Sequence, residues 1–191
     1  FRASATPLSG GFPKVSCICV TFGRTEVLDE CVHSFLIQDY PGEKEMIILN
    51  DYGNLELKGD FPNVKIINEK TRYPSLGEKR NACIEYCSGE LISIWDDDDV
   101  FLPNRLTTSV KRIGIKPYIV LNKHVYYSDE IRIIPYGVNA QAMFYKSLWK
   151  EVGGYPPITN GEDIKFENEK LDLVNIDTNI HTVFSHQDHP V

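Results

Sequence analysis

Short apolar runs alternate with segments of helical spacing along the first half of the chain. The runs are rich in β-branched side chains, as is typical of buried strands, and they cover residues 15–20, 45–49, 64–67 and 91–95. Between the first two runs, apolar residues recur at helical spacing from Val27 to Leu36, and we expect Thr25 to cap that helix. Strand and helix therefore alternate from the start of the pattern.

Two further helices are predicted, one on either side of the fourth strand. Residues 75–78 read Ser-Leu-Gly-Glu and have the form of a capping box, so a helix should start near Leu76 and run towards Gly89. After the strand, Pro103 suits the first turn of a helix that ends at Gly114. The alternation thus continues to this point.

The pattern changes in the second half, where strand-like runs follow one another directly. They cover residues 118–121, 125–127, 131–134 and 141–145 and are joined by polar or Pro-Gly turns, which predicts antiparallel or mixed pairing. A parallel half joined to a smaller mixed half favours the α/β class, with an open, mostly parallel, Rossmann-like sheet flanked by helices. Its site is expected at the junction.

Composition fits one soluble domain. With 191 residues, 42% hydrophobic and 25% charged, we expect a flexible lead-in at residues 1–13 and a single domain at 14–191. No apolar stretch is long enough to span a bilayer, so a cytoplasmic protein is expected. The formal net charge of -7 disfavours nucleic acid as a partner. Five cysteines, an odd number within apolar patterns, are expected to be reduced core residues.

Four consecutive carboxylates, Asp96 to Asp99, directly follow the predicted strand at 91–95. Crowded like charges raise one another's pKa, whereas a divalent ion favours the ionised oxygens. Oxygen ligands suit Mg²⁺ or Mn²⁺, and Mg²⁺ is typically completed by water and substrate phosphate. A solvated acidic turn is the alternative. The position after a buried strand, where α/β sheets bind ligands, favours a metal and a phosphate-bearing substrate.

Acidic and hydroxyl side chains follow several predicted elements, at Thr21, Asp51, Asp96 to Asp99 and Glu162-Asp163. In this order and spacing the chain resembles family 2 glycosyltransferases with the GT-A fold. The matching segments are 15–24, 34–51, 79–90, 96–105 and 152–166. The resemblance implies metal-dependent, inverting transfer of a sugar from a nucleotide-sugar, usually a UDP-sugar, to an acceptor hydroxyl. It also implies a nucleotide-binding half at 14–100 and an acceptor half at 101–191.

The resemblance implies that the nucleotide is bound by Val20, Thr21, Asp51, Arg80, Asp96 and Asp97. Asp51 could accept an N–H bond from a pyrimidine ring, since an ionised carboxylate only accepts. The planar guanidinium of Arg80 suits bidentate donation to phosphate oxygens. A solvated helix face fits Lys79 equally well, and Arg72 is a second basic candidate in the loop before the helix.

The metal ligands and the catalytic base are also implied by the resemblance. Asp98 is the expected direct ligand, Asp96 assists it, and His186 near the end of the chain is a candidate third ligand. Four consecutive Asp residues leave the register of the Asp-x-Asp motif open by one residue, and alternate residues of an extended segment face opposite ways. Asp163 is the expected general base and Glu162 the reserve; acidic residues at a helix start are the structural alternative.

Two other functions fit the same features. A sugar-phosphate nucleotidyltransferase shares the sheet and the metal, but it uses a Gly-rich basic first loop, and residues 21–25 hold one glycine. A non-catalytic nucleotide-binding or sugar-binding module would use the acidic run as a cation site alone. The sequence names neither the donor sugar nor the acceptor.

Overall fold

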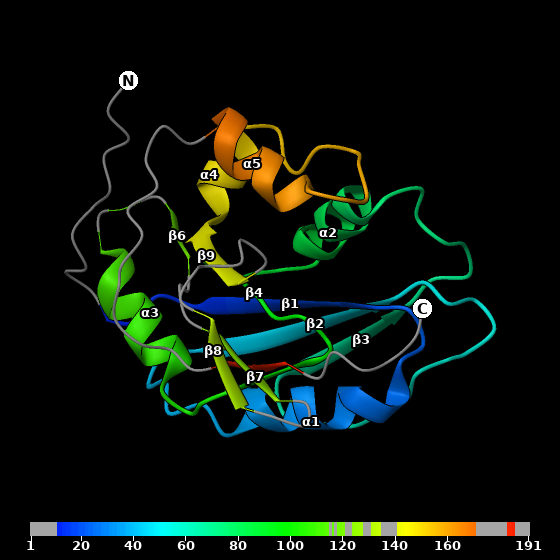
Figure 1. Ribbon diagram of the computed structural model, residues 1–191, viewed down its shortest axis with the longest axis horizontal. Coiled ribbons are helices and arrows are strands. Elements are labelled where there is room, and N and C mark those ends of the chain that lie inside the picture. The colour runs from blue at the N-terminus through cyan, green and yellow to red at the C-terminus, as the bar shows by residue number, and fades with distance from the viewer. Residues whose placement is uncertain are drawn as a thin grey trace.

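The computed structural model describes residues 11–114, 116, 118–120, 124–127, 131–134, 141–170 and 183–185. Its centre is a six-stranded sheet in the order β3-β2-β1-β4-β9-β6, with helices on both faces (Figure 1). The predicted α/β class is confirmed. Most of the predicted lead-in at 1–13 lies outside the described residues.

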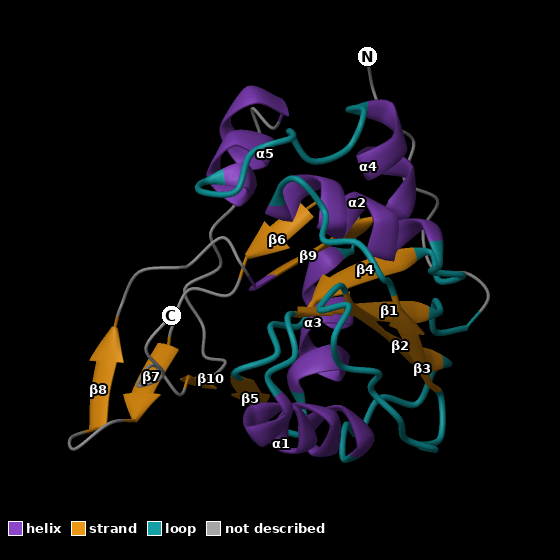
Figure 2. Ribbon diagram, turned by 90° about the vertical axis from the view of Figure 1, so that its right-hand side faces the viewer, coloured by secondary structure: helices purple, strands orange, loops and turns teal. Residues whose placement is uncertain are grey.

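The parallel part of the sheet consists of its first four strands. β1 (Val15–Thr21) pairs with β2 (Lys44–Asn50) on one side and β4 (Leu91–Ile94) on the other, and β3 (Val64–Asn68) pairs with β2. All four were predicted. Because they are parallel, their carboxyl ends meet at one edge of the sheet, which faces the viewer in Figure 2.

The second half is mixed, as its pattern indicated. β9 (Ala142–Tyr145) lies antiparallel between β4 and β6 (Tyr118–Val120). A separate four-stranded sheet has the order β5-β10-β7-β8, formed by β5 (Asp99–Phe101), β10 (Val183–Ser185), β7 (His124–Tyr127) and β8 (Ile131–Ile134). The strand β5 was not predicted, and it makes Asp99 the first residue of a second sheet.

Five helices are seen in the described part of the chain. α1 (Thr25–Leu36) and α3 (Arg105–Ile113) cover one face of the central sheet. α2 (Leu76–Glu85), α4 (Lys146–Glu151) and α5 (Glu162–Lys170) cover the other (Figures 1 and 2). None of these helices is long and apolar enough to cross a membrane.

The predicted helix starts were partly right. Ser75 caps α2 as expected: its hydroxyl accepts the Glu78 N–H at 3.2 Å and donates to the Glu78 carboxylate at 2.7 Å. The prediction for Thr25 was wrong, because Thr25 is already helical and Arg24 holds the N-cap position without a side-chain cap bond. Pro103 likewise lies outside α3, before its N-cap residue.

Each face of the sheet has its own hydrophobic core, because successive strand residues point to opposite faces. In β1, Cys17 and Cys19 pack with α1 and α3, whereas Ile18 packs with α2. All five cysteines are buried and free, as expected of reduced core residues. These two cores hold the carboxyl ends of β1, β2 and β4 in fixed relative positions.

Candidate functional site

Lys79 joins the carboxyl ends of β1 and β2. Its Nζ donates to the main-chain oxygen of Thr21 at 2.6 Å and forms an ion pair with Asp51. The second oxygen of Asp51 accepts the main-chain N–H of Tyr73 at 2.9 Å. Of the two alternatives left open for Lys79, the solvated helix face is excluded, because the side chain is buried between α2 and the strand ends.

The four aspartates after β4 alternate between buried and open positions. The side chains of Asp97 and Asp99 are buried, whereas those of Asp96 and Asp98 are 23% and 27% exposed. Asp99 accepts a hydrogen bond from Gln141 Nε2 at 2.6 Å. Asp96 and Asp98 are therefore the two carboxylates of the run with solvent access.

Arg24 holds the middle of this acidic run. Its Nε donates to Asp97 Oδ2 at 3.0 Å, its Nη2 donates to Asp97 Oδ1, and its Nη1 donates to Asp98 Oδ2 at 3.0 Å. Sequence reasoning missed this contact, since 73 residues separate Arg24 from Asp97. The one local signal is its position in the turn that leaves β1.

Arg80 links the acidic run to the start of α5. It is buried, with Nη2 3.4 Å from Asp96 Oδ1 and Nη1 3.0 Å from Glu162 Oε1. The guanidinium carbon lies 5.6 Å from the centre of the Tyr155 ring. The predicted Asp96, Arg80 and Glu162 are thus brought together, although they come from three separate segments.

Asn81, the next residue of α2, anchors the segment between α4 and α5. Its side-chain oxygen accepts the Trp149 indole N–H and the Tyr155 main-chain N–H, each at 2.8 Å. Its side-chain nitrogen donates to the Tyr155 main-chain oxygen at 2.9 Å. This asparagine lies in the segment 79–90 that carries the family resemblance, but the sequence alone assigned it no role.

The two acidic residues at the start of α5 have different surroundings. Glu162 is buried and paired with Arg80, whereas Asp163 is partly exposed and accepts the main-chain N–H of Ile164 at 2.8 Å. Burial raises the pKa of the Glu162 carboxyl, against the opposing effect of Arg80. Asp163 is thus the more accessible carboxylate of the pair.

Burial and the neighbouring carboxylates raise the pKa of Asp96, Asp97 and Asp99 by more than the nearby arginines lower it. Burial raises the pKa of Asp96 to about 6, Arg80 lowers it, and Asp98 raises it further. Burial and the charges of Asp96 and Asp98 raise the pKa of Asp99 to about 8. Arg105 lies beneath the run, donates to the Ile94 main-chain oxygen at 2.6 Å, and has its pKa lowered to about 10 by burial. Three arginines therefore face four carboxylates.

The oxygen donors on the open side fit a hard divalent cation. Asp96 and Asp98 supply two carboxylates, which matches the one or two that typically hold Mg²⁺ alongside water and phosphate. Among the described side chains, no three from His, Cys, Asp and Glu converge to hold a metal by themselves. His186, the predicted third ligand, lies outside the described residues.

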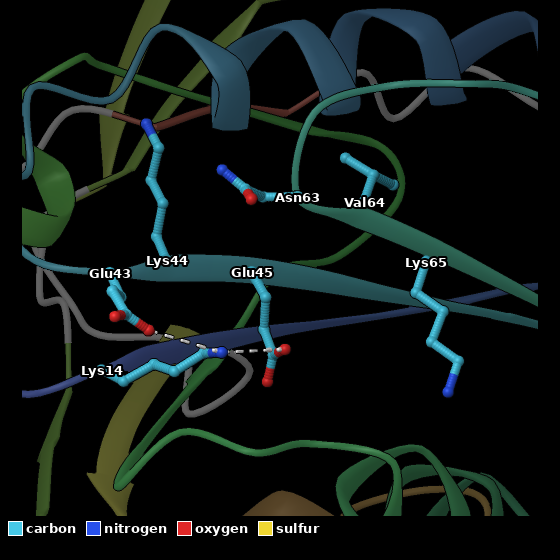
Figure 3. A pocket seen from close by; sticks show the side chains of 7 residues that line it. All are labelled: Lys14, Glu43, Lys44, Glu45, Asn63, Val64 and Lys65. Atoms are coloured by element: carbon cyan, nitrogen blue, oxygen red, sulfur yellow. Dashed lines mark ion pairs between the residues drawn. The ribbon is translucent and has the colours of Figure 1, made fainter.

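A separate hollow of about 330 Å³ lies at the other end of the sheet, beside the amino ends of β1 to β3 (Figure 3). It is lined by Lys14, Glu43, Lys44, Glu45, Asn63, Val64 and Lys65. Lys14 lies 3.7 Å from Glu43 and 3.6 Å from Glu45, and Lys44 donates to three main-chain oxygens at the end of α1. The charged groups of the hollow thus pair within the protein, and the hollow lies at the opposite end of the sheet from the acidic run.

Solved structures with the same fold include S. aureus TarS in complex with UDP-GlcNAc, with a TM-score of 0.73 and 16% identity over 92% of this chain and 60% of that one. The mannosyltransferase PcManGT from Pyrobaculum calidifontis, in complex with GDP-Man and Mn²⁺, gives a TM-score of 0.70 and 14% identity over 95% and 59%. The sheet and its flanking helices are therefore those of the GT-A fold.

Curated proteins that are similar in sequence include two bacterial ones. The uncharacterized glycosyltransferase YwdF of Bacillus subtilis (strain 168) is 26% identical over 143 residues, which is 73% of this chain and 53% of that protein. The Campylobacter jejuni GalNAc(5)-diNAcBac-PP-undecaprenol beta-1,3-glucosyltransferase is 28% identical over 108 residues, 52% of this chain and 34% of that protein. The chain thus spans about half of the first relative and a third of the second.

A family model matches most of the chain. It is that of glycosyl transferase family 2, and the match runs from residue 16 to residue 181. This range includes the ends of β1, β2 and β4, the acidic run and the Glu162-Asp163 pair. The chain therefore belongs to glycosyl transferase family 2.

Proposed function

We propose that this chain transfers a sugar from a nucleotide-sugar, with a UDP-sugar as the first candidate, to an acceptor hydroxyl with inversion at the anomeric carbon. The observation that carries the proposal is the link through Arg80, which brings the solvent-accessible Asp96 and the start of α5 within reach of one guanidinium. In a family 2 chain this arrangement supports a donor site that lies beside a candidate base.

The nucleotide is proposed to bind at the carboxyl ends of β1 and β2. Val20, Thr21 and Asp51 lie there, and Lys79 fixes the Asp51 carboxylate from behind. An ionised carboxylate has four lone-pair sites. Beside its two protein contacts, Asp51 can therefore accept a hydrogen bond from an N–H group of the nucleotide's pyrimidine ring. TarS, a GT-A neighbour, binds UDP and UDP-GlcNAc, which makes UDP the first nucleotide to test.

A divalent cation, Mn²⁺ or Mg²⁺, is proposed to bind Asp98 with Asp96 assisting. The exposure of these two carboxylates supports the register Asp96-x-Asp98, while Asp97 shapes the nucleotide side of the site from a buried position. When bound, such an ion supplies positive charge for the departing diphosphate. His186 stays a proposed third ligand.

Asp163 is proposed as the general base. It would take the proton of the acceptor hydroxyl as that oxygen attacks the anomeric carbon from the face opposite the diphosphate. Glu162 is less suited to this task because its carboxylate is buried against Arg80. Arg80 is still proposed to contact the nucleotide-sugar donor. Its pairing with Asp96 supports a role in which Arg80 acts on the donor by positioning that carboxylate.

Two substitutions test these assignments. Asp98→Asn should abolish metal-dependent UDP binding, whereas Asp163→Asn should leave UDP binding intact and remove sugar transfer. Asp60→Asn, in an exposed loop, is the matched control and should change neither property. Full activity of Asp163→Asn would show that the base is assigned wrongly.

The donor can be identified by thermal shift with a panel of nucleotide-sugars and Mn²⁺. A ligand at a hundred times its Kd should stabilise the folded chain by about 2.7 kcal/mol. Release of pyrophosphate from a nucleoside triphosphate and a sugar phosphate would instead indicate a nucleotidyltransferase. Tight UDP binding without turnover of any donor would indicate a binding module.

A further inference from the structure

Arg24 reaches the acidic run from a turn of fixed shape. The turn contains Gly23 in the left-handed region, with φ of +71°, where a Cβ atom would lie 2.5 Å from the Tyr52 ring. The main chain therefore leaves β1 in one direction, and the next side chain, Arg24, points across the edge of the sheet to Asp97 and Asp98.

The two contacts of Arg24 differ in kind. Asp97 is 1% exposed and is held by two N–H groups, a bidentate arrangement that favours one geometry. Asp98 is 27% exposed and is held by the single Nη1 at 3.0 Å. The Arg24 side chain itself is 45% exposed. The inner contact is thus an anchor, whereas the outer one can be exchanged for a ligand in solvent.

Asp98 is also the carboxylate proposed to bind the divalent cation, so the two positive groups compete for it. A cation on Asp98 would repel Nη1, and a diphosphate beside that cation would offer Nη1 a charged oxygen in exchange. Guanidinium groups suit phosphate oxygens because their N–H groups are fixed in a plane. Because the guanidinium is planar and Asp97 holds its Nε and Nη2, Nη1 would stay in place, and the Asp98 side chain would turn from Nη1 towards the cation.

We propose that Arg24 takes the place of the cation on Asp98 in the unliganded protein and transfers its Nη1 bond to the donor diphosphate when the cation binds. This inference rests on the proposed function, because it requires Asp98 to bind the metal and the donor to carry a diphosphate. It adds Arg24 to the donor site as a phosphate-binding residue with a second role before the donor arrives.

The proposal predicts that one substitution, Arg24→Gln, changes the affinity for Mn²⁺ and the affinity for UDP in opposite directions. In Arg24→Gln, Mn²⁺ alone should bind several-fold more tightly, because Asp98 is freed from a competing positive charge. UDP at saturating Mn²⁺ should bind about tenfold or more weakly, because a charge-assisted bond to phosphate is lost. A residue that only supports the local fold would weaken both.

The experiment is isothermal titration calorimetry with Mn²⁺ alone and then with UDP at saturating Mn²⁺. Arg24→Gln leaves the Asp97 carboxylate buried without a charged partner, so Arg24→Lys is measured beside it. Lysine keeps one positive charge at Asp97 but lacks the branched group that reaches Asp98. Arg24→Lys should therefore also bind Mn²⁺ more tightly and UDP more weakly than the wild type. The control Lys58→Gln, in an exposed pair with Glu56, should match the wild type.

The outcomes separate the two proposals. A wild-type chain that binds neither Mn²⁺ nor UDP removes the proposed function itself. Wild-type binding with unchanged affinities in both folded Arg24 variants overturns the role of Arg24 and leaves the proposed function standing. Weaker binding of both ligands in Arg24→Lys, with a wild-type circular dichroism spectrum, also overturns it. Tighter Mn²⁺ with weaker UDP supports it.

Discussion

Asn81→Ala tests whether α2 holds the segment that carries the candidate base. The asparagine side chain makes three hydrogen bonds, to the Trp149 indole and to both main-chain groups of Tyr155. Trp149 and Tyr155 are themselves buried, so alanine would leave three polar groups with restricted access to water. The loss should therefore reduce stability and loosen the approach to Asp163.

The magnitude follows from the number of bonds. Each contributes about 1 kcal/mol net, or about 3 kcal/mol for three, and the better helix propensity of alanine returns about 0.5 kcal/mol. We therefore expect a loss of roughly 2 to 3 kcal/mol in the free energy of unfolding. For a chain of this size the Tm should fall by about 4 to 12 °C.

The assay is urea unfolding followed by fluorescence, with hydrogen exchange at the Tyr155 amide as a local readout. Asn54→Ala is the matched control because Asn54 is exposed in a loop, and its stability should stay within about 0.5 kcal/mol of the wild type. Equal stability of Asn81→Ala and the wild type would refute the reasoning. So would a loss of stability without faster exchange at Tyr155.

Three further predictions concern other contacts. Gly77→Ala should lower the Tm although alanine favours helix, because its Cβ would lie 1.9 Å from the Pro156 main-chain oxygen; a raised Tm would contradict this. Lys79→Met should destabilise the chain by about 3 to 5 kcal/mol in urea unfolding, since it leaves buried Asp51 unpaired; a loss below about 1 kcal/mol would show that water replaces the lysine. Burial raises the pKa of Glu45, but hydrogen bonds from two serines and a nearby lysine outweigh it and keep the pKa below its usual value. The stability that the carboxylate confers should thus be present above the ordinary Glu pKa of about 4.3 and be lost as the pH falls through the lower pKa of the folded state. The deficit of Glu45→Gln should therefore shrink on acidification, and a pH-independent deficit would exclude this linkage.

Local patterns were enough to predict the four parallel strands and the helix α2, which carry much of the site. The four parallel strands and the capping box of α2 were found because their signals lie within a few residues of one another. The six-residue helix α4 and the three-residue strand β5 were missed, since neither is long enough for a period to be recognised.

Contacts within the site were harder to predict because they depend on pairing across the fold. Arg24 and Asp97 meet only because β1 and β4 are neighbours in the sheet. For Lys79 the sequence left a solvated helix face open beside a site role, and the adjacent strand ends bury the side chain. The role of each basic residue is therefore set by strand order, which spacing along the chain does not reveal.

The contacts of α2 fix its rotational phase. Successive residues of an α-helix point about 100° apart, so Lys79, Arg80 and Asn81 fan out towards β2, the acidic run and the segment before α5. Inserting or deleting one residue earlier in α2 would turn all three side chains away from their partners at once. Among family members that keep these contacts, length variation should therefore occur in the flanking loops and spare the first turns of this helix.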